Sequence, residues 1–256
     1  MRVAAAHHLG WLRAALIAVA VAALEIVCRS GLVSRQVIIA PSQMAAALWD
    51  ILWSGRFNVD ISQTMACVVA ALVLAAVFGF IGGVALHALP RLRQALDPLL
   101  ATYYAVPFFV FYPVLIVLFG LGRGPVIAVA FLFAVVAMVI NTLNGLDRIP
   151  KVLTKVARIH HLSPLSTALR LKLPAAAPHL FTGLKLAVAY VFIGVIASEF
   201  IMAASGLGYQ ISYAYNNFDN RTMYALMLFV IIVVTGVNMA LHVWEQRALA
   251  HRRPPP

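Results

Sequence analysis

Long apolar runs, separated by short polar segments, dominate the pattern of this chain. Lipid offers backbone groups no hydrogen-bond partner, so a span across a ~30 Å hydrocarbon core is a helix of about 20 residues. Six runs reach or approach that length. The pattern therefore predicts an all-α, polytopic membrane protein with six transmembrane helices. The runs lie at roughly Ala14–Cys28, Met65–Leu89, Leu99–Leu121, Pro125–Leu146, Pro178–Ala204 and Tyr224–Trp244.

The composition agrees with this pattern. Apolar residues make up 63% of the chain and charged residues 11%, whereas soluble proteins are about half apolar and a quarter charged. Little chain is left outside the six runs, so we expect a single transmembrane domain over residues 1–256 and no soluble domain. Cys28 and Cys67 lie in apolar helical contexts, which does not indicate a disulfide framework.

The lysines and arginines predict the orientation of the helices. The net charge is +11, and with a cytoplasmic N-terminus fourteen Lys and Arg fall in inner segments against five in outer ones. Cytoplasmic loops carry the positive excess in membrane proteins. We therefore expect both termini in the cytoplasm, and we attribute the basic excess to topology rather than to nucleic-acid binding. The basic-then-apolar start of the chain is interpreted as an uncleaved first helix, because five further spans follow.

The densest basic segment is Lys151–Pro174, between the fourth and fifth runs, with five Lys and Arg. Lys151–Leu162 is compatible with a first helix. Ser163 followed by Pro164 is typical of an N-cap and the first helical position, which predicts a second helix. Histidine enters the left-handed backbone region more readily than most residues, so His161 allows a turn between the two helices without a glycine.

The second of these helices has one apolar face, formed by Leu165, Ala168 and Leu169. Pro174 disfavours helix at Leu173, so we expect the segment to end there. A short helix–turn–helix with an apolar face, held against the membrane, is suited to docking against a cytoplasmic partner. A solvated basic loop that obeys only the positive-inside rule is the alternative.

The third run is interrupted by Pro107 and Pro113, and Tyr103, Tyr104 and Tyr112 cluster around the break. Proline removes an intrahelical hydrogen bond. At membrane depth a broken helix is tolerated where it is buried in protein or lines a water-filled cavity. The break therefore indicates either a pathway-lining segment or a packing kink.

Glu199 lies inside the fifth run, near its outer end. An intramembrane carboxylate is a functional candidate by default, although a carboxylate near the end of a span can also reach the membrane surface. The segment that follows, SGLGYQISYAYNNFDNR, is polar and contains glycines.

Two weaker patterns concern packing and the membrane surface. Gly79 and Gly83 form a G-x-x-x-G pair, which permits close approach between helices. Ser42 is expected to cap a helix over Gln43–Trp53, whose apolar face and tryptophans fit the outer membrane surface. An extension of the first span over the same residues is the alternative.

Several short motifs follow one another along the chain. They are Ile39-Ala40-Pro41-Ser42, Leu96-Asp97-Pro98-Leu99, Val106-Pro107, Phe119-Gly120-Leu121-Gly122, Asn141-Thr142 with Gly145, Ala197-Ser198-Glu199-Phe200 and Ser205-Gly206-Leu207-Gly208-Tyr209. In order and spacing they resemble the inner-membrane permease subunits of bacterial ABC importers, the nitrate, sulfonate and taurine group in particular. The resemblance implies a type I ABC importer permease fold, with a core transport domain at about 60–245 and cytoplasmic coupling helices at 151–174.

The hallmark of that family is a cytoplasmic motif of Glu-Ala-Ala, three residues, Gly, nine residues, Ile, one residue and Leu-Pro. Counting back from Leu173-Pro174 places Leu171 at the Ile, His161 at the Gly and Lys155-Val156-Ala157 at the Glu-Ala-Ala. The spacing is similar, but the Glu is Lys and the Gly is His. The resemblance and the local pattern together assign coupling to an ATPase to Lys155, Ala157, Arg158, His161, Leu165, Leu169, Leu173 and Pro174.

The resemblance also implies partners and a pathway. The partners are an ATP-binding ABC subunit, a periplasmic or lipid-anchored solute-binding protein and a second permease copy, in a homodimer or a heterodimer, in the bacterial inner membrane. A small solute is implied, such as a sulfonate, taurine or nitrate anion, and heterocyclic vitamin precursors are imported by the same group. Helix irregularity and the resemblance together assign the pathway and gate to Tyr104, Pro107, Pro113, Glu199, Ser205, Gly206 and Gly208.

The absence of some motifs narrows the function. The sequence has no G-x-x-x-x-G-K-[ST] phosphate cradle, so we expect a permease subunit that is not an enzyme, with ATP and Mg²⁺ used by the partner. We expect no metal and no other cofactor on this chain, because its histidines lack metal-ligand spacing.

Two rival classes remain. A secondary transporter or channel, acting without an ATPase, is disfavoured by the few intramembrane charges and the lack of a clear internal repeat. An intramembrane serine protease would use Ser205 and His242, but these residues are expected near opposite ends of their spans.

Overall fold

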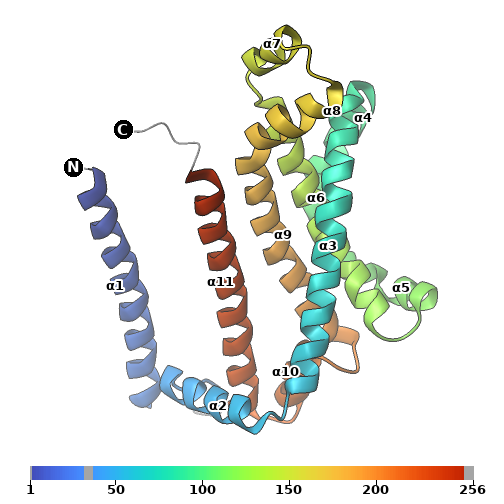
Figure 1. The fold of residues 1–256 in the computed structure, drawn as a ribbon. Helices are drawn as coiled ribbons and strands as arrows, with labels where there is room; N and C mark the ends of the chain where they lie inside the picture. The colour runs from blue at the N-terminus through green and yellow to red at the C-terminus, as the bar shows by residue number, and fades with distance from the viewer. Residues whose placement is uncertain (1, 32–36, 251–256) are drawn as a thin grey trace. The chain divides into compact units, whose positions relative to one another are not determined.

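The computed structural model describes residues 2–31 and 37–250, and in these residues all regular elements are helical, with no strand (Figure 1). The all-α fold predicted from the apolar pattern is confirmed. The helices form two compact units, one of residues 1–59 and 210–231 and the other of residues 60–209 and 232–256.

Four described helices are long and apolar enough to cross a membrane. Each matches one predicted span, although the helices extend beyond the apolar runs at one or both ends. They are α3 (Asn58–Ala88), α6 (Arg123–Asp147), α9 (Leu173–Met202) and α11 (Asn220–Ala250).

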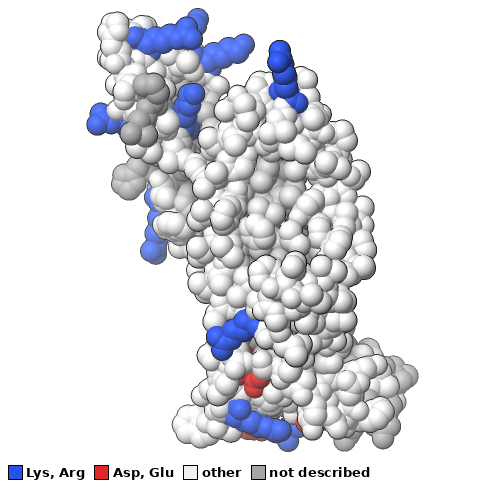
Figure 2. Space-filling model, turned by 90° about the vertical axis from the view of Figure 1, so that its right-hand side faces the viewer, with Lys and Arg blue, Asp and Glu red and all other residues white. Residues whose placement is uncertain are grey.

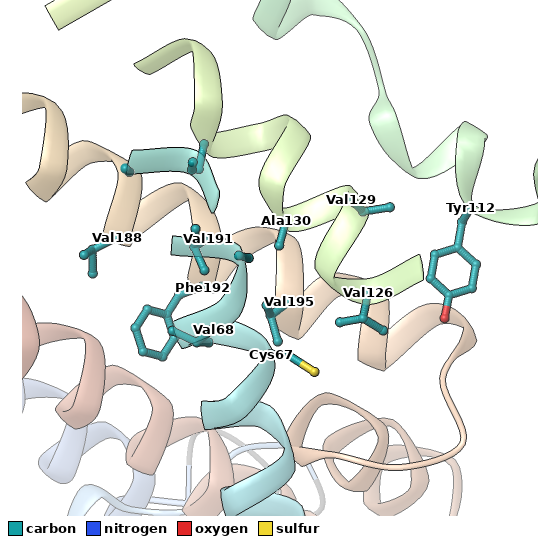
Figure 3. Close-up of a cluster of buried hydrophobic side chains, with 14 residues drawn as sticks. Cys67, Val68, Tyr112, Val126, Val129, Ala130, Val188, Val191, Phe192 and Val195 are labelled. Atoms are coloured by element: carbon teal, nitrogen blue, oxygen red, sulfur yellow. The ribbon is translucent and has the colours of Figure 1, made fainter. Parts of the chain in front are cut away.

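The core of the larger unit consists of small and β-branched residues on α3, α6 and α9. Val68 of α3, Val129 and Ala130 of α6 and Val191 and Val195 of α9 belong to one cluster of buried side chains (Figure 3). Val129, Ala130, Val191 and Val195 have no exposed surface. Because these side chains are short, α6 and α9 pack closely along their lengths.

Glycines bring α3 into direct contact with α6. A Cβ added at Gly79 would lie 2.6 Å from the Cβ of Met138, and one at Gly83 would lie 2.5 Å from the Cβ of Thr142. Real Cβ atoms do not approach this closely, so both positions require glycine. The close helix contact predicted from the G-x-x-x-G pair is confirmed.

The third apolar run lies in two helical segments that meet at a sharp bend. The bend between them is 91° over a break of a few residues. The first segment consists of α4 (Pro90–Thr102) and a 3₁₀ turn at Tyr103–Ala105. The second consists of a 3₁₀ turn at Phe108–Phe111 and α5 (Tyr112–Phe119).

The two prolines of this run have different effects. Val106 is extended, with φ −80° and ψ 121°, which is the conformation that a following proline favours. Pro107 therefore marks the predicted break. Pro113 instead lies in the first turn of α5, where its missing N–H is not needed. The prediction that Pro113 interrupts a helix was wrong, because it begins one.

The smaller unit contains α2 (Pro41–Ser54), which is a separate helix and not an extension of the first span. Ala47 and Leu48 pack against Ala225 of α11. On its outward side Trp49 and Trp53 are exposed and stacked, with ring centroids 6.3 Å apart. This amphipathic arrangement is the one predicted for a helix at a membrane surface.

The predicted N-cap of α2 was wrong by two residues. Ala40 is the N-cap and Pro41 opens the helix. The Gln43 side chain accepts the Ala40 N–H at 3.3 Å. The Ser42 hydroxyl donates to Glu25 at 2.6 Å instead of capping the helix.

The first predicted span lies within α1 (Arg2–Arg29), whose described side chains from Ala15 onward are mostly exposed and apolar. The number of spans, six, remains a prediction.

Candidate functional site

The basic segment between α6 and α9 folds into two short helices, as predicted: α7 (Lys151–Ile159) and α8 (Pro164–Thr167). The Ser163 hydroxyl accepts the Ser166 N–H at 3.2 Å, which is the contact of an N-cap. His161 has a φ of +48° and so occupies the left-handed position between the helices. Residues 151–172 are called the basic knob below.

The helix that follows Ser163 does not end at Pro174, contrary to the sequence-based expectation. Ala168–Lys172 form a turn of π-helix, and Leu173 is helical with φ −60° and ψ −47°. The chain therefore continues from α8 into α9 without a break. Pro174 has no N–H, so it cannot make the α-helical hydrogen bond to the carbonyl of Arg170. The π turn just before it uses hydrogen bonds between residues five apart, and this shift in pairing accompanies the proline within a continuous helix.

The knob projects beyond the ends of α6 and α9 (Figure 1), and most of its predicted coupling residues reach solvent. The side chain of Leu165 lies outside the described residues, so the predicted apolar face is seen only at Ala168 and Leu169, which are both exposed. Among the other coupling residues, Lys155, Arg158 and His161 are exposed, Ala157 is buried, and Leu173 and Pro174 are half-buried.

Two hollows adjoin the knob. One of about 540 Å³ lies on the knob itself. The other, of about 520 Å³, lies between the knob and the ends of α3 and α6, and is mostly apolar with Lys151, Lys172 and His87 at its wall.

An ion-pair network that the sequence did not indicate joins the same ends of α3, α4 and α6. The Arg93 guanidinium donates to both carboxylate oxygens of Asp147, at 2.9 and 2.7 Å. His87 lies 3.1 Å from the same carboxylate. Bidentate arginine–carboxylate contacts fix geometry as well as charge, so this network holds α4 against α3 and α6.

At the opposite end of α9, Glu199 is 2% exposed. The Thr64 hydroxyl of α3 lies 3.0 and 2.8 Å from the two Glu199 oxygens and donates to the carboxylate. The same hydroxyl accepts the Leu207 N–H at 2.8 Å. Gly208 N–H donates to Glu199 Oε2 at 3.0 Å. The alternative in which Glu199 reaches the membrane surface was therefore wrong.

Asp60 completes this arrangement by accepting the Gly206 N–H at 3.0 Å. Residues 60, 64 and 199, with the backbone of residues 206–208, are called the Glu199 cluster. Its three side chains accept hydrogen bonds from three successive backbone N–H groups, and these bonds join the segment after α9 to α3 and α9. Asp60 and Thr64 were missed because only tertiary structure brings them within reach of residues about 140 positions away.

The two glycines of the cluster are required by close approach. Gly206 has a φ of +99°, and a Cβ there would collide with the Glu199 carboxylate. At Gly208 a Cβ would collide with the carbonyl oxygen of Ile196. The predicted gate residues Glu199, Gly206 and Gly208 are thus in contact, and Ser205 joins Glu199 at the wall of a cavity of about 130 Å³ that Arg123 also lines.

The other predicted pathway residues lie elsewhere in the larger unit. Tyr104 is 41% exposed and stacks on Tyr190 of α9, with centroids 4.8 Å apart. Pro107 lies at the bend, and Pro113 is exposed on α5. The structure therefore brings Glu199, Ser205, Gly206 and Gly208 together but leaves Tyr104, Pro107 and Pro113 outside the walls of that cavity.

The geometry excludes Ser205 and His242 as a protease pair. His242 bonds to Gln246 at 2.9 Å and neighbours Glu245, which pairs with Lys185 of α9 at 2.7 Å. α9 ends at Met202, just before Ser205. With a rise of 1.5 Å per helical residue, Lys185 lies about 25 Å from that end, so His242 on the Lys185 side is far from Ser205.

Comparison with known proteins agrees with this fold. Residues 75–252 match the family described as "Binding-protein-dependent transport system inner membrane component", and the chain belongs to this family. It is 31% identical over 207 residues to the "Nitrate import permease protein NrtB" of Leptolyngbya laminosa, covering 77% of this chain and 74% of that protein.

Two further relatives extend the comparison. The chain is 25% identical over 244 residues to the "Putative aliphatic sulfonates transport permease protein SsuC" of Bacillus subtilis (strain 168), covering 95% of this chain and 88% of that one. A solved structure titled "Inward facing conformations of the MetNI methionine ABC transporter" superposes with a TM-score of 0.66 at 19% identity, over 78% of this chain and 98% of that chain. The resemblance stated from sequence motifs is confirmed: the chain is a translocation subunit of an ABC importer with the type I permease fold.

Proposed function

We propose that this chain forms half of a twelve-helix pathway, paired with a second copy or a similar subunit. Two ATP-binding subunits bind ATP and Mg²⁺ on the cytoplasmic side, and a solute-binding protein delivers the solute from outside. The basic knob carries this proposal, because a protruding, rigidly capped helix pair between two spans is suited to receiving a movement from a partner.

Both ends of the chain lie in the cytoplasm in this proposal, on the same side as the knob. ATP-driven closure of the ATP-binding subunits moves the two knobs, and the paired membrane halves then open to the other side. Such rigid-body movement between two packed states is an ordinary form of alternating access.

The Glu199 cluster provides an outer gate in this scheme. Its hydrogen bonds join the segment after α9 to α3, so a movement of α9 that starts at the knob reaches that segment through one continuous helix. The residues proposed for coupling are those of the knob and of the start of α9, and Glu199, Ser205, Gly206 and Gly208 form the gate.

The proposed substrate is a small anion. The relatives are named for import of nitrate, bicarbonate and aliphatic sulfonates, all of which are anions. In this chain Arg123 lines the small cavity beside the gate and supplies a positive charge there.

The test is affinity co-purification of the tagged chain from its native membrane, followed by uptake assays in vesicles. A stoichiometric ATPase should accompany the wild type and the Leu169→Met control, and should be lost with Leu169→Glu. Uptake should require that ATPase and ATP. If the chain purifies alone and still moves solute, it is a carrier or channel and the proposed function is wrong.

A further inference from the structure

The basic knob has no acidic residue. Between Asp147 and Glu199 the sequence contains no Asp or Glu, while the knob carries Lys151, Lys155, Arg158, Arg170 and Lys172. None of the ion pairs among the described residues involves any of these five. Lys185, further along α9, is in contrast paired with Glu245.

These charges face outward. Lys151, Lys155, Arg158 and Arg170 are exposed. On the face shown in Figure 2, Lys and Arg side chains gather over α7, with no Asp or Glu among them. Like charges held together repel one another, and a partner surface of opposite sign relieves that repulsion and steers association.

α7 presents a defined contact stripe. Val152, Lys155 and Ile159 are spaced i, i+3 and i+7, so they share one face of the helix. All three are exposed, with Val152 at 65% and Ile159 at 73%. The opposite side holds Ala157, which is 5% exposed. Exposed apolar residues on either side of a charge are typical of an interface with a protein groove.

A basic hollow lies on the side of α7 that bears Ala157, away from this stripe. Its volume is about 540 Å³, and Arg158, His161 and Lys172 are among its seven lining residues, none of which is acidic. A carboxylate side chain from a partner would find two cations there and no competing anion. The hollow therefore has the size and the charge to receive acidic side chains.

We propose that the knob docks in an acidic groove of the ATP-binding subunit, with Lys155 facing a carboxylate between the apolar contacts of Val152 and Ile159. The inference rests on the proposed function, and it further specifies that the docking surface of the ATP-binding subunit is negatively charged. Lys155 stands where the family motif has Glu, so the pairing has the opposite polarity to one made through Glu. An ATP-binding subunit whose groove carries basic residues is rejected by repulsion.

The first test compares ATPase retention on the full-length tagged chain in four forms: wild type, Lys155→Arg, Lys155→Glu and Arg247→Glu. Arg247 is exposed near the end of α11 and is not one of the knob residues, and its reversal changes the net charge by the same amount. Lys155→Glu should weaken retention at least about tenfold, and Lys155→Arg and Arg247→Glu should retain the ATPase as the wild type does. Equal retention in all four forms overturns the proposal but leaves the proposed function intact.

The second test identifies the partner group. A zero-length carbodiimide joins a lysine amine to a carboxylate, so treatment of the purified complex should link Lys155 to an Asp or Glu of the ATPase. Changing that acid to Lys should restore retention with Lys155→Glu. A Lys155 that links to no acid of the retained ATPase contradicts the proposal, whereas a chain that retains no ATPase contradicts the proposed function itself.

Anionic lipid is the competing occupant. Val152→Cys, in a chain with Cys28 and Cys67 replaced, is labelled with an impermeant maleimide in open vesicles of phosphatidylcholine with or without phosphatidylglycerol. Labelling should be equal in both lipids and should slow only when the ATPase is added. Protection by phosphatidylglycerol alone would show that the stripe serves the membrane and would overturn the proposal.

Discussion

At the residue scale, the most consequential side chain outside the knob is Thr64. Its single hydroxyl accepts the Leu207 N–H and donates to Glu199, so it lies at the centre of a chain of hydrogen bonds between α3, α9 and the segment after α9. A buried carboxylate and a buried N–H both lose solvation, and the cost is large if either partner is removed.

Thr64→Val should therefore destabilise the protein, because it keeps the shape of the side chain and removes both hydrogen bonds. The expected loss is about 1–3 kcal/mol, which for a chain of this size corresponds to roughly 2–4 °C in melting temperature per kcal/mol. Thr64→Ser retains the hydroxyl and serves as the control. Thermal unfolding in detergent measures both, and an unchanged melting temperature for Thr64→Val would show that the Glu199 cluster does not stabilise the fold.

At the element scale, the contact of α3 with α6 depends on where glycine lies on the helix. Gly83 faces Thr142 at a distance that leaves no room for a Cβ, whereas at the adjacent Gly82 a Cβ would make an ordinary contact of 3.5 Å with Val139 Cγ2. Both residues are glycines of α3, but only Gly82 has room for a Cβ.

Gly83→Ala should destabilise the protein by about 1–3 kcal/mol, because the added methyl group must push α3 away from α6. Gly82→Ala is the matched control and should be neutral or stabilising by up to about 1 kcal/mol, since alanine favours helix. Chemical unfolding of the two variants side by side measures the difference. Equal stability of both variants would mean that α3 and α6 do not pack in the register described.

At the scale of the whole molecule, the path of α4 and α5 decides the number of membrane spans. Their 91° bend is compatible with a broken span or with a re-entrant loop. If they cross, three spans separate Ser54 from Ser163, and the two residues lie on opposite sides. If they form a re-entrant loop, both residues lie on the same side.

Ser54→Cys should react with an impermeant maleimide only from outside, and Ser163→Cys only from the cytoplasm. Both positions are exposed, while the native Cys28 and Cys67 are buried. Right-side-out and inverted vesicles provide the two orientations, and the unaltered chain gives the background. Reaction of both cysteines from one side would reduce the predicted six spans to five helices that cross and one loop that returns.

The sequence alone was sufficient for the fold class, four long apolar helices, the break at Pro107, the capped turn at Ser163 and the left-handed His161. These features depend on local properties: apolar length, the extended backbone that a proline favours in the residue before it, the backbone preference of histidine, and a serine side chain that bonds to backbone three residues away. Local prediction was wrong at Pro113, which lies in the first turn of α5, and at Pro174 and Ser42. At Pro174 and Ser42 a neighbouring element, the π turn or Glu25, offered an arrangement that the local pattern does not contain.

Tertiary structure alone decided the Glu199 cluster and the network of His87, Arg93 and Asp147. Their partners come from different helices, and hydrogen bonds reach only about 3 Å, so no spacing along the chain reveals them. The sequence determined the charge of the knob, because charge belongs to composition. Packing decided which of those charges face outward, because exposure depends on which sides of α7 and of the π turn at Ala168–Lys172 are covered by the rest of the larger unit.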